Sequence, residues 1–144
     1  MATEVEFHTG VADVTGFACR LLRKAYRQGA QLLVAAPAAA LAELDRRLWM
    51  QEAPDFVPHV RLPAQERVAL RSPIWLVSDW AAAPAEAAAG RVYVNLGADM
   101  PPSPAALPRI IEVLGCDADE VQAGRTRWRL YKTQGLNVVH HNSA

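Results

Sequence analysis

Short apolar runs and amphipathic stretches alternate along the first third of the chain. Residues 5–8 have the hydrophobic–polar alternation of a short strand, and residues 31–36 contain the continuous apolar run expected of a strand buried on both faces. Between these runs, apolar side chains recur at helical spacing. Asp13 is placed to cap the amino end of this helix, and Gly29 is placed to end it. The pattern therefore predicts a strand, a helix and a second strand.

The same alternation continues toward the carboxyl terminus. Pro37 stands where the first turn of a second helix is expected, and this helix should extend to about Trp49. Further strands are predicted at residues 74–77, 92–96 and 109–114, and a last helix at residues 119–134. Strands that alternate with helices favour an α/β fold of three layers, with helices on both faces of a mostly parallel sheet. No internal repeat or linker divides the sequence, so we expect a single domain over residues 1–144.

The last predicted helix carries a cationic stripe beside an apolar one. At about 100° per residue, three cations fall on one face: Arg125, Arg129 and Lys132. Three apolar or aromatic side chains lie next to them: Val121, Trp128 and Tyr131. This arrangement suits a site that holds an acidic peptide ending in an apolar anchor. It is equally typical of a solvated helix face, and the helix alone does not separate the two interpretations.

Residues that would carry catalysis or bind a cofactor are not arranged for either task. Neither a P-loop nor a Gly-x-Gly-x-x-Gly fingerprint follows the first strand, and Gly10 is better explained as a turn residue. The four histidines have no metal-ligand spacing, and we expect His140 and His141 to be an exposed pair near a loose carboxyl terminus. Glu43 and Asp45 lie two positions apart on a predicted helix, so their side chains point in different directions. The sequence therefore predicts no catalytic residue, cofactor or metal.

Exposed aromatic side chains are the next candidates for function. Trp49, Met50 and Phe56 fall on the connection that follows the second predicted helix, and such residues are common anchors in protein–protein contacts. The alternative is that Trp49 closes the bottom of the sheet. We expect Trp75 to be in the core, whereas the pattern leaves Trp80 undecided.

Composition narrows the class of protein. Fifteen basic residues balance fifteen acidic ones, and this zero net charge argues against a general nucleic-acid coat. No run of about 18 apolar residues and no signal-peptide pattern is present, so we expect a cytoplasmic protein without a membrane span. Cys19 and Cys116 have no metal-ligand spacing, and we expect two buried thiols in a reducing compartment.

Two segments of the chain resemble a known family. The first is Leu44-Asp45, Leu48-Trp49 and then Phe56-Val57-Pro58-His59, and the second is Arg125-x-Arg127-Trp128-x-x-Tyr131-Lys132-x-x-Gly135-x-Asn137. In order and spacing they are similar to the chi subunit of bacterial DNA polymerase III holoenzyme. With the first two predicted strands, the resemblance covers nearly the whole chain.

The resemblance implies a non-catalytic accessory subunit associated with the clamp loader. Proteins of this family have a nucleotide-binding type of α/β fold without a working phosphate loop. They bind the acidic, phenylalanine-terminated tail of single-stranded DNA-binding protein, and a small second subunit, psi. The tail site then includes Arg125, Trp128 and Arg129, with Tyr131, Lys132 and Val121 close by. Phe56 falls on the psi-facing surface and Trp49 near either interface, and we assign Trp49, Met50 and Phe56 to the partner-subunit surface.

This sequence departs from the family pattern at two positions of the implied tail site. Val121 stands where a lysine is expected, and Trp128 where a tyrosine is expected. The tail site should therefore be less cationic here.

Two other functions remain as alternatives. Direct nucleic-acid binding would use the basic faces of the first and last helices, but zero net charge and the acidic start of the last helix weigh against it. A nucleotide-dependent enzyme on the same fold lacks the phosphate loop and an acid–base pair.

Overall fold

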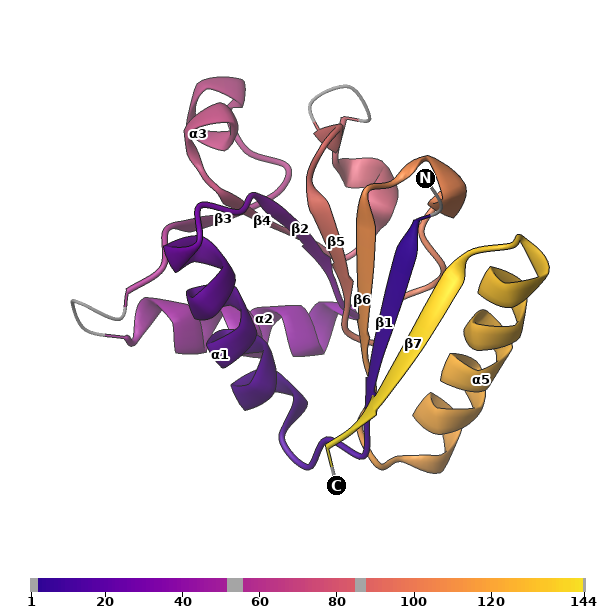
Figure 1. Ribbon diagram of the computed structural model, residues 1–144. Coiled ribbons are helices and arrows are strands. Elements are labelled where there is room, and N and C mark those ends of the chain that lie inside the picture. Colours follow the sequence, from indigo (N-terminus) through magenta and orange to yellow (C-terminus); the bar gives the residue numbers. More distant parts are fainter. Residues whose placement is uncertain (1–2, 52–55, 85–87, 144) are drawn as a thin grey trace.

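The computed structural model describes residues 3–51, 56–84 and 88–143, and their centre is a seven-stranded sheet in which every pair of neighbouring strands is parallel (Figure 1). The order across the sheet is β3-β4-β2-β5-β6-β1-β7. The strands are β1 (Glu4–Thr9), β2 (Leu32–Ala35), β3 (His59–Arg61), β4 (Ile74–Val77), β5 (Val92–Asn95), β6 (Arg109–Val113) and β7 (Asn137–Asn142). The prediction of an α/β fold with a mostly parallel sheet is confirmed.

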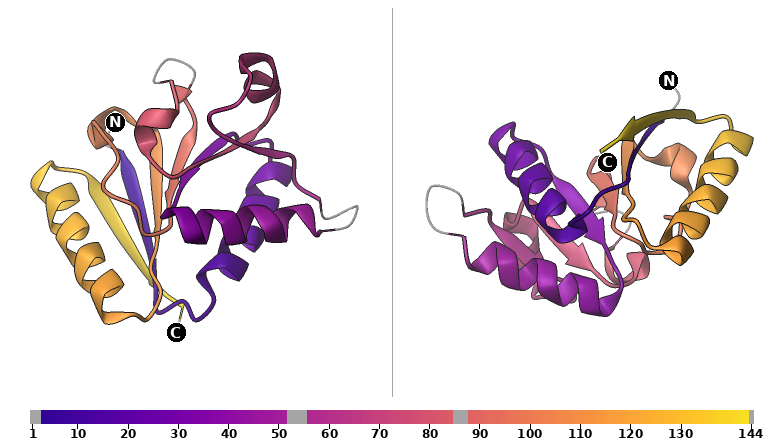
Figure 2. Two further views of the ribbon diagram at one scale, coloured as in Figure 1. Left: turned by 180° about the vertical axis from the view of Figure 1, so that it is seen from behind. Right: turned by 90° about the horizontal axis from the view of Figure 1, so that it is seen from below.

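Helices cover both faces of this sheet (Figure 2). Within the described residues the α-helices are α1 (Val14–Arg27), α2 (Ala38–Trp49), α3 (Glu66–Arg71) and α5 (Ala118–Thr133). Leu22 of α1 and Leu44 of α2 are buried in one core cluster, together with residues of β2, β4, β5 and β6. Tyr131 of α5 is buried in a second cluster on the opposite face, with Phe7 and Trp75. The three predicted layers are therefore present.

The predicted ends of the first helix are confirmed, and a side chain also caps α5. Asp13 accepts a hydrogen bond from the main-chain N–H of Gly16 and so caps α1. Gly29, which follows α1, has a φ of 80°, a conformation that favours glycine. Asp117 caps α5 by accepting from the N–H groups of Asp119 and Glu120.

Two strands were not predicted from the sequence. β3 has only three residues, too few for a recognisable alternation. The expectation of a loose carboxyl terminus is wrong, because β7 pairs with β1 along its whole length, from Asn137 opposite Glu4 to Asn142 opposite Thr9. His140 and His141 are exposed, as expected, but they belong to this edge strand. β7 is largely exposed and polar, so its hydrophobic pattern is weak.

The cysteines and tryptophans divide between core and surface. Cys19 is buried, but Cys116 is exposed, which corrects the expectation of two buried thiols; it lies in the surface turn between β6 and α5. Trp75 and Trp80 are both buried, and their indole N–H groups donate to the carbonyls of Ala69 and Asp99 at 2.7 and 2.8 Å. Trp49 is 61% exposed and does not close the sheet.

Candidate functional site

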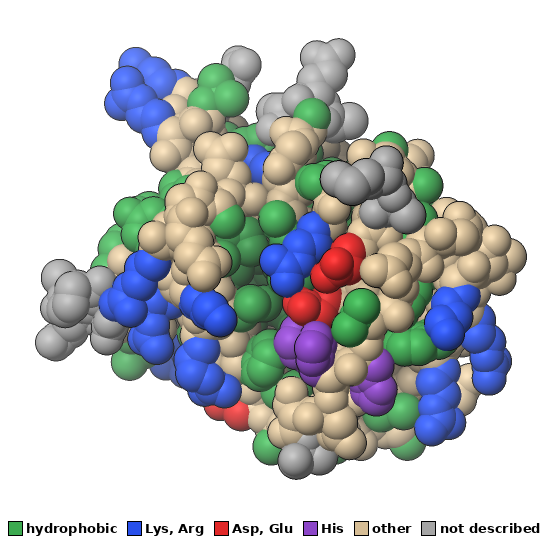
Figure 3. All heavy atoms as spheres, in the orientation of Figure 1, with side chains coloured by type: hydrophobic (Ala, Val, Ile, Leu, Met, Phe, Trp, Pro, Cys, Tyr) green, Lys and Arg blue, Asp and Glu red, His purple; other side chains and the backbone are tan. Residues whose placement is uncertain are grey.

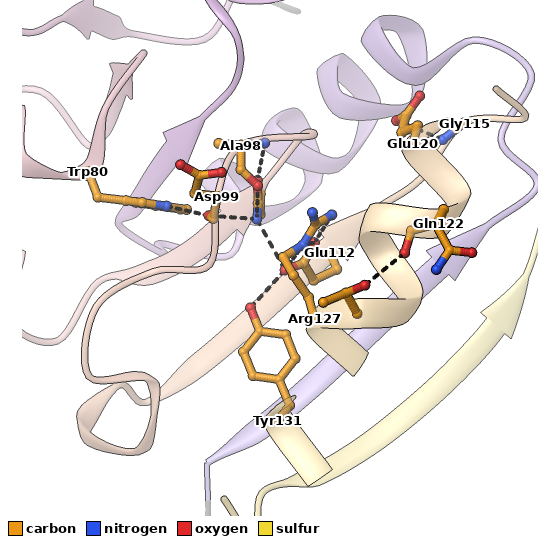
Figure 4. A network of polar contacts seen from close by, with 11 residues as sticks. Trp80, Ala98, Asp99, Glu112, Gly115, Glu120, Gln122, Arg127 and Tyr131 are labelled. Carbon is orange, nitrogen blue, oxygen red and sulfur yellow. Dashed lines mark hydrogen bonds and ion pairs between the residues drawn. The ribbon is translucent and has the colours of Figure 1, made fainter. Parts of the chain in front are cut away.

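Helix α5 is held against the sheet by a buried polar network (Figure 4). Glu112 on β6 is fully buried and lies 3.0 Å from Nη2 of Arg127. The hydroxyl of Tyr131 donates to the same carboxylate at 2.7 Å, and the side-chain amide of Asn95 donates to it at 3.1 Å. Arg127 and Tyr131 are one helical turn apart, so this face of α5 is fixed to β6 at two points.

Burial controls the ionisation of this network. Desolvation raises the pKa of the Glu112 carboxyl, while Arg127, Tyr131 and Asn95 act in the opposite direction by stabilising the charged form. Desolvation also raises the pKa of the Tyr131 hydroxyl, with a further contribution from the charge of Glu112. Tyr131 therefore stays protonated and serves as a hydrogen-bond donor.

On the adjacent face of α5 a cavity of about 430 Å³ opens between the helix and the sheet. Its walls come from β1, from β7, from the turn after β6 and from the first three turns of α5. The lining residues are Phe7, Thr9, Leu114, Val121, Gly124, Arg125, Trp128, Arg129 and His140. Its size falls in the range of about 300–1,000 Å³ that is common for small-ligand sites.

Aromatic rings build the inner wall of this cavity. The ring of Trp128 meets that of Phe7 edge to face, with centroids 5.0 Å apart, and meets that of His140 at 5.8 Å. The ammonium of Lys132 lies 5.1 Å from the centroid of the Trp128 ring, close enough for a cation–π contact. The cavity is thus apolar inside, with cations at its rim.

Gly124 makes room for this arrangement. A Cβ at this position would lie 2.3 Å from Cδ1 of Leu114, so the absence of a side chain allows α5 to approach the end of β6 closely. Gly124 and Leu114 both line the cavity.

None of the described carboxylates pairs with the cations at the rim. Within the part of the chain that the structure describes, no carboxylate forms an ion pair with Arg125, Arg129 or Lys132. By contrast, Arg46 and Arg47 both pair with Glu43. The rim is therefore an uncompensated positive patch, and Lys and Arg side chains gather over α5 at the right of Figure 3.

The structure brings together four of the six residues that the sequence placed at the tail site: Val121, Arg125, Trp128 and Arg129. Lys132 lies beside them, over the Trp128 ring. Tyr131 does not line the cavity, because its side chain points into the core and its hydroxyl binds Glu112. The helical stripe predicted from the sequence includes Tyr131, because periodicity alone does not show which side of the helix packs against the sheet.

Several cavity residues were missed by sequence reasoning. Phe7 was assigned only to a strand, Thr9 was placed just after that strand, and His140 was assigned to a loose terminus. A parallel pairing of β7 with β1 was needed to bring His140 beside Phe7, and the sequence contains no signal for it.

A second exposed surface lies at the opposite edge of the sheet. Trp49, Phe56 and His59 form an aromatic cluster, with the Trp49 ring 5.4 Å from that of Phe56 and 5.0 Å from that of His59. They border a cavity of about 260 Å³ beside β3 and α3. Met50 is 67% exposed, and Arg46 contacts its sulfur at 3.0 Å. We call the exposed surface formed by Trp49, Phe56 and the adjacent Met50 the aromatic patch.

The described residues offer no other obvious chemistry. Among them, no three His, Cys, Asp or Glu side chains gather into a group able to hold a metal ion. None of the helices in this part of the chain is long and apolar enough to cross a membrane.

Known proteins resemble the chain over most of its length. The family model for the DNA polymerase III chi subunit, HolC, matches residues 2–139. The DNA polymerase III subunit chi of Pseudomonas aeruginosa is 30% identical over 132 residues, which cover 86% of this chain and 82% of that protein. The chain therefore belongs to the DNA polymerase III chi subunit family, and is a replication accessory subunit of that polymerase.

Proposed function

We propose that this subunit binds the acidic, phenylalanine-terminated tail of single-stranded DNA-binding protein in the cavity beneath α5, and so links that protein to the DNA polymerase III holoenzyme. In this role it acts as an adaptor without catalytic activity. The observation that carries the proposal is an aromatic-walled cavity bordered by cations that have no carboxylate partner within the described chain.

The cavity suits a terminal phenyl ring. Val121, Leu114 and Trp128 supply apolar surface, and Phe7 closes the inner end. An aromatic side chain buries about 150–250 Å², most of it apolar, which is a large gain for one residue. The departures from the family pattern at Val121 and Trp128 add to this apolar surface.

The rim suits the charges of such a tail. A guanidinium offers two parallel N–H donors to a carboxylate, so Arg125 or Arg129 fits the terminal carboxylate in a bidentate pair. Lys132, one turn further along α5, is placed to attract acidic residues upstream of the phenylalanine. Because these cations are exposed, salt should weaken their contribution.

The aromatic patch supports a second attachment point, for which psi is the candidate partner. It lies at the β3 edge, whereas the cavity lies at the β7 edge of the seven-stranded sheet. Six interstrand steps of about 4.8 Å separate these edges by about 29 Å along the sheet. The two cavities share no lining residue, so two partners need not compete for the same surface.

Single substitutions test the tail site. Binding of a fluorescent acidic peptide ending in phenylalanine should be roughly micromolar, or about −8 kcal/mol, because only a small area is buried. Arg125→Ala should weaken it at least about tenfold, since a charged hydrogen bond contributes about 1.5–3 kcal/mol. The matched control is Arg67→Ala on α3, which removes the same charge from an exposed site on another helix. Equal affinity for wild type and both variants would contradict the proposal.

A further inference from the structure

Strand β7 forms one edge of the sheet, and no other strand of the described residues pairs with its outer side. The main-chain N–H of Asn137 donates to the carbonyl of Thr3, and that of Ser143 donates to the carbonyl of Thr9. Along a strand, successive residues turn their N–H and C=O groups to opposite sides. The odd-numbered residues of β7 therefore bind β1. Val138 and His140 turn their N–H and C=O groups away from the sheet.

We propose that the acidic residues upstream of the terminal phenylalanine add to β7 as an eighth strand. This inference rests on the proposed function, because it takes the same tail as the ligand. The open main-chain groups of Val138 and His140 would then pair with the peptide backbone, in the way that extended peptides join exposed sheet edges.

The position of the cavity fixes the direction of the added strand. The cavity is lined by Thr9 and Leu114, which lie at or just beyond the carboxyl ends of β1 and β6, and by His140 in the second half of β7. A peptide whose last residue enters this cavity must run back toward the amino end of β7. Its carboxyl end then lies beside the carboxyl end of β7, so the added strand is parallel, like every other neighbour pair in the sheet.

Charge supports the same path. Arg129 lines the same cavity as His140 of β7, and Lys132 lies over the Trp128 ring, which meets the His140 ring at 5.8 Å. The carboxyl-terminal half of α5 runs along the β7 side of the sheet (Figure 1). Arg129 and Lys132 are on that half of the helix, and neither has a carboxylate partner in the described residues. An acidic strand along β7 would therefore run next to these unpaired cations.

The other edge of the sheet is a poorer template. β3 has three residues, whereas β7 has six. β7 also carries no proline, and its central residues are Val-Val-His-His, which do not oppose pairing as lysines or prolines would.

Backbone methylation of the peptide tests the added strand without altering the protein. A series of acidic peptides ending in phenylalanine would each carry one N-methyl group at a successive position. Every second methyl group should weaken binding about tenfold, because it removes one hydrogen bond and adds a clash. The intervening methyl groups should have little effect. Affinity that is insensitive to all methyl groups, with the parent peptide still bound, would overturn the inference and leave the proposed function intact.

Amide hydrogen exchange gives an independent measurement on the intact protein. The N–H groups of Val138 and His140 should exchange quickly in the free protein and at least about tenfold more slowly with the parent peptide bound. Those of Val139 and His141, which face β1, are the internal control. Peptide binding without protection at Val138 and His140 would overturn the added strand. Absence of any peptide binding would overturn both proposals.

Discussion

Arg125 and Arg127 are two residues apart on α5 and illustrate how position decides the role of a side chain. Arg125 is exposed at the rim of the cavity and has no ion pair within the described chain. Arg127 is buried and pairs with the fully buried Glu112. Sequence reasoning identified Arg125 from the cationic stripe. It gave no role to Arg127, because only the packed structure shows the carboxylate that this residue meets.

Arg127→Met should be strongly destabilising. The substitution leaves the Glu112 carboxylate buried without its cation, and such losses cost about 3–5 kcal/mol. Arg125→Met, the matched exposed substitution, should change stability by less than about 0.5 kcal/mol. Chemical denaturation of both variants measures the two free energies of unfolding, and a similar small loss in both would contradict the role given to the network.

Acid should remove a stabilising contribution from Glu43. Hydrogen bonds from Arg46 and Arg47 lower the pKa of this carboxyl from its ordinary value of 4.5 to about 2. A depressed folded-state pKa stabilises the native protein above the unfolded pKa, and the effect is lost as the pH falls through the folded value. Glu43→Gln should thus lower the melting temperature above pH 4.5, and the difference from wild type should shrink as the pH approaches 2. A difference that stays constant over this window would contradict the assignment.

At the scale of the element, α5 has three faces with separate tasks. One face binds Glu112 through Arg127 and Tyr131, a second lines the cavity, and a third is in solvent. The sequence predicted the ends of this helix well, because its acidic start and its periodicity are local signals. It placed Tyr131 on the wrong side of the boundary between core and surface, since that boundary depends on how the helix packs.

Gly124→Ala tests the close contact of α5 with the sheet. Alanine favours the helix by about 1 kcal/mol, but its Cβ would lie 2.3 Å from a methyl carbon of Leu114. Overpacking of this kind typically costs about 1–3 kcal/mol, so we expect no net gain in stability and a narrower cavity. Thermal unfolding and peptide titration measure both effects. Higher stability with unchanged peptide affinity would show that Leu114 leaves room for a side chain at position 124.

At the scale of the whole molecule, the sheet separates two candidate contact surfaces. The strands that form its centre were predicted because their apolar runs are strong, but its two edge strands, β3 and β7, were missed. These edges are short or polar, so they carry little hydrophobic pattern. The cavity lies at the β7 edge and the aromatic patch at the β3 edge. The sequence therefore indicated candidate residues but not how they come together into sites.

We expect the cavity and the aromatic patch to bind their partners independently. Trp49→Ala removes an exposed side chain from the aromatic patch, at the opposite edge from the cavity. Distant sites with no shared contacts usually behave additively, so tail-peptide affinity should be unchanged within about twofold. Titration of this variant beside wild type provides the check, and a large loss of affinity would mean that the two edges are coupled.

The most direct measurement of the central claim is a calorimetric titration of the protein with an acidic peptide ending in phenylalanine, beside the same peptide without that residue, at low and moderate salt. We predict roughly micromolar binding that weakens with salt and disappears when the phenylalanine is removed. Equal binding of both peptides, or binding of neither, would contradict the assignment of the α5 cavity as the site for the tail.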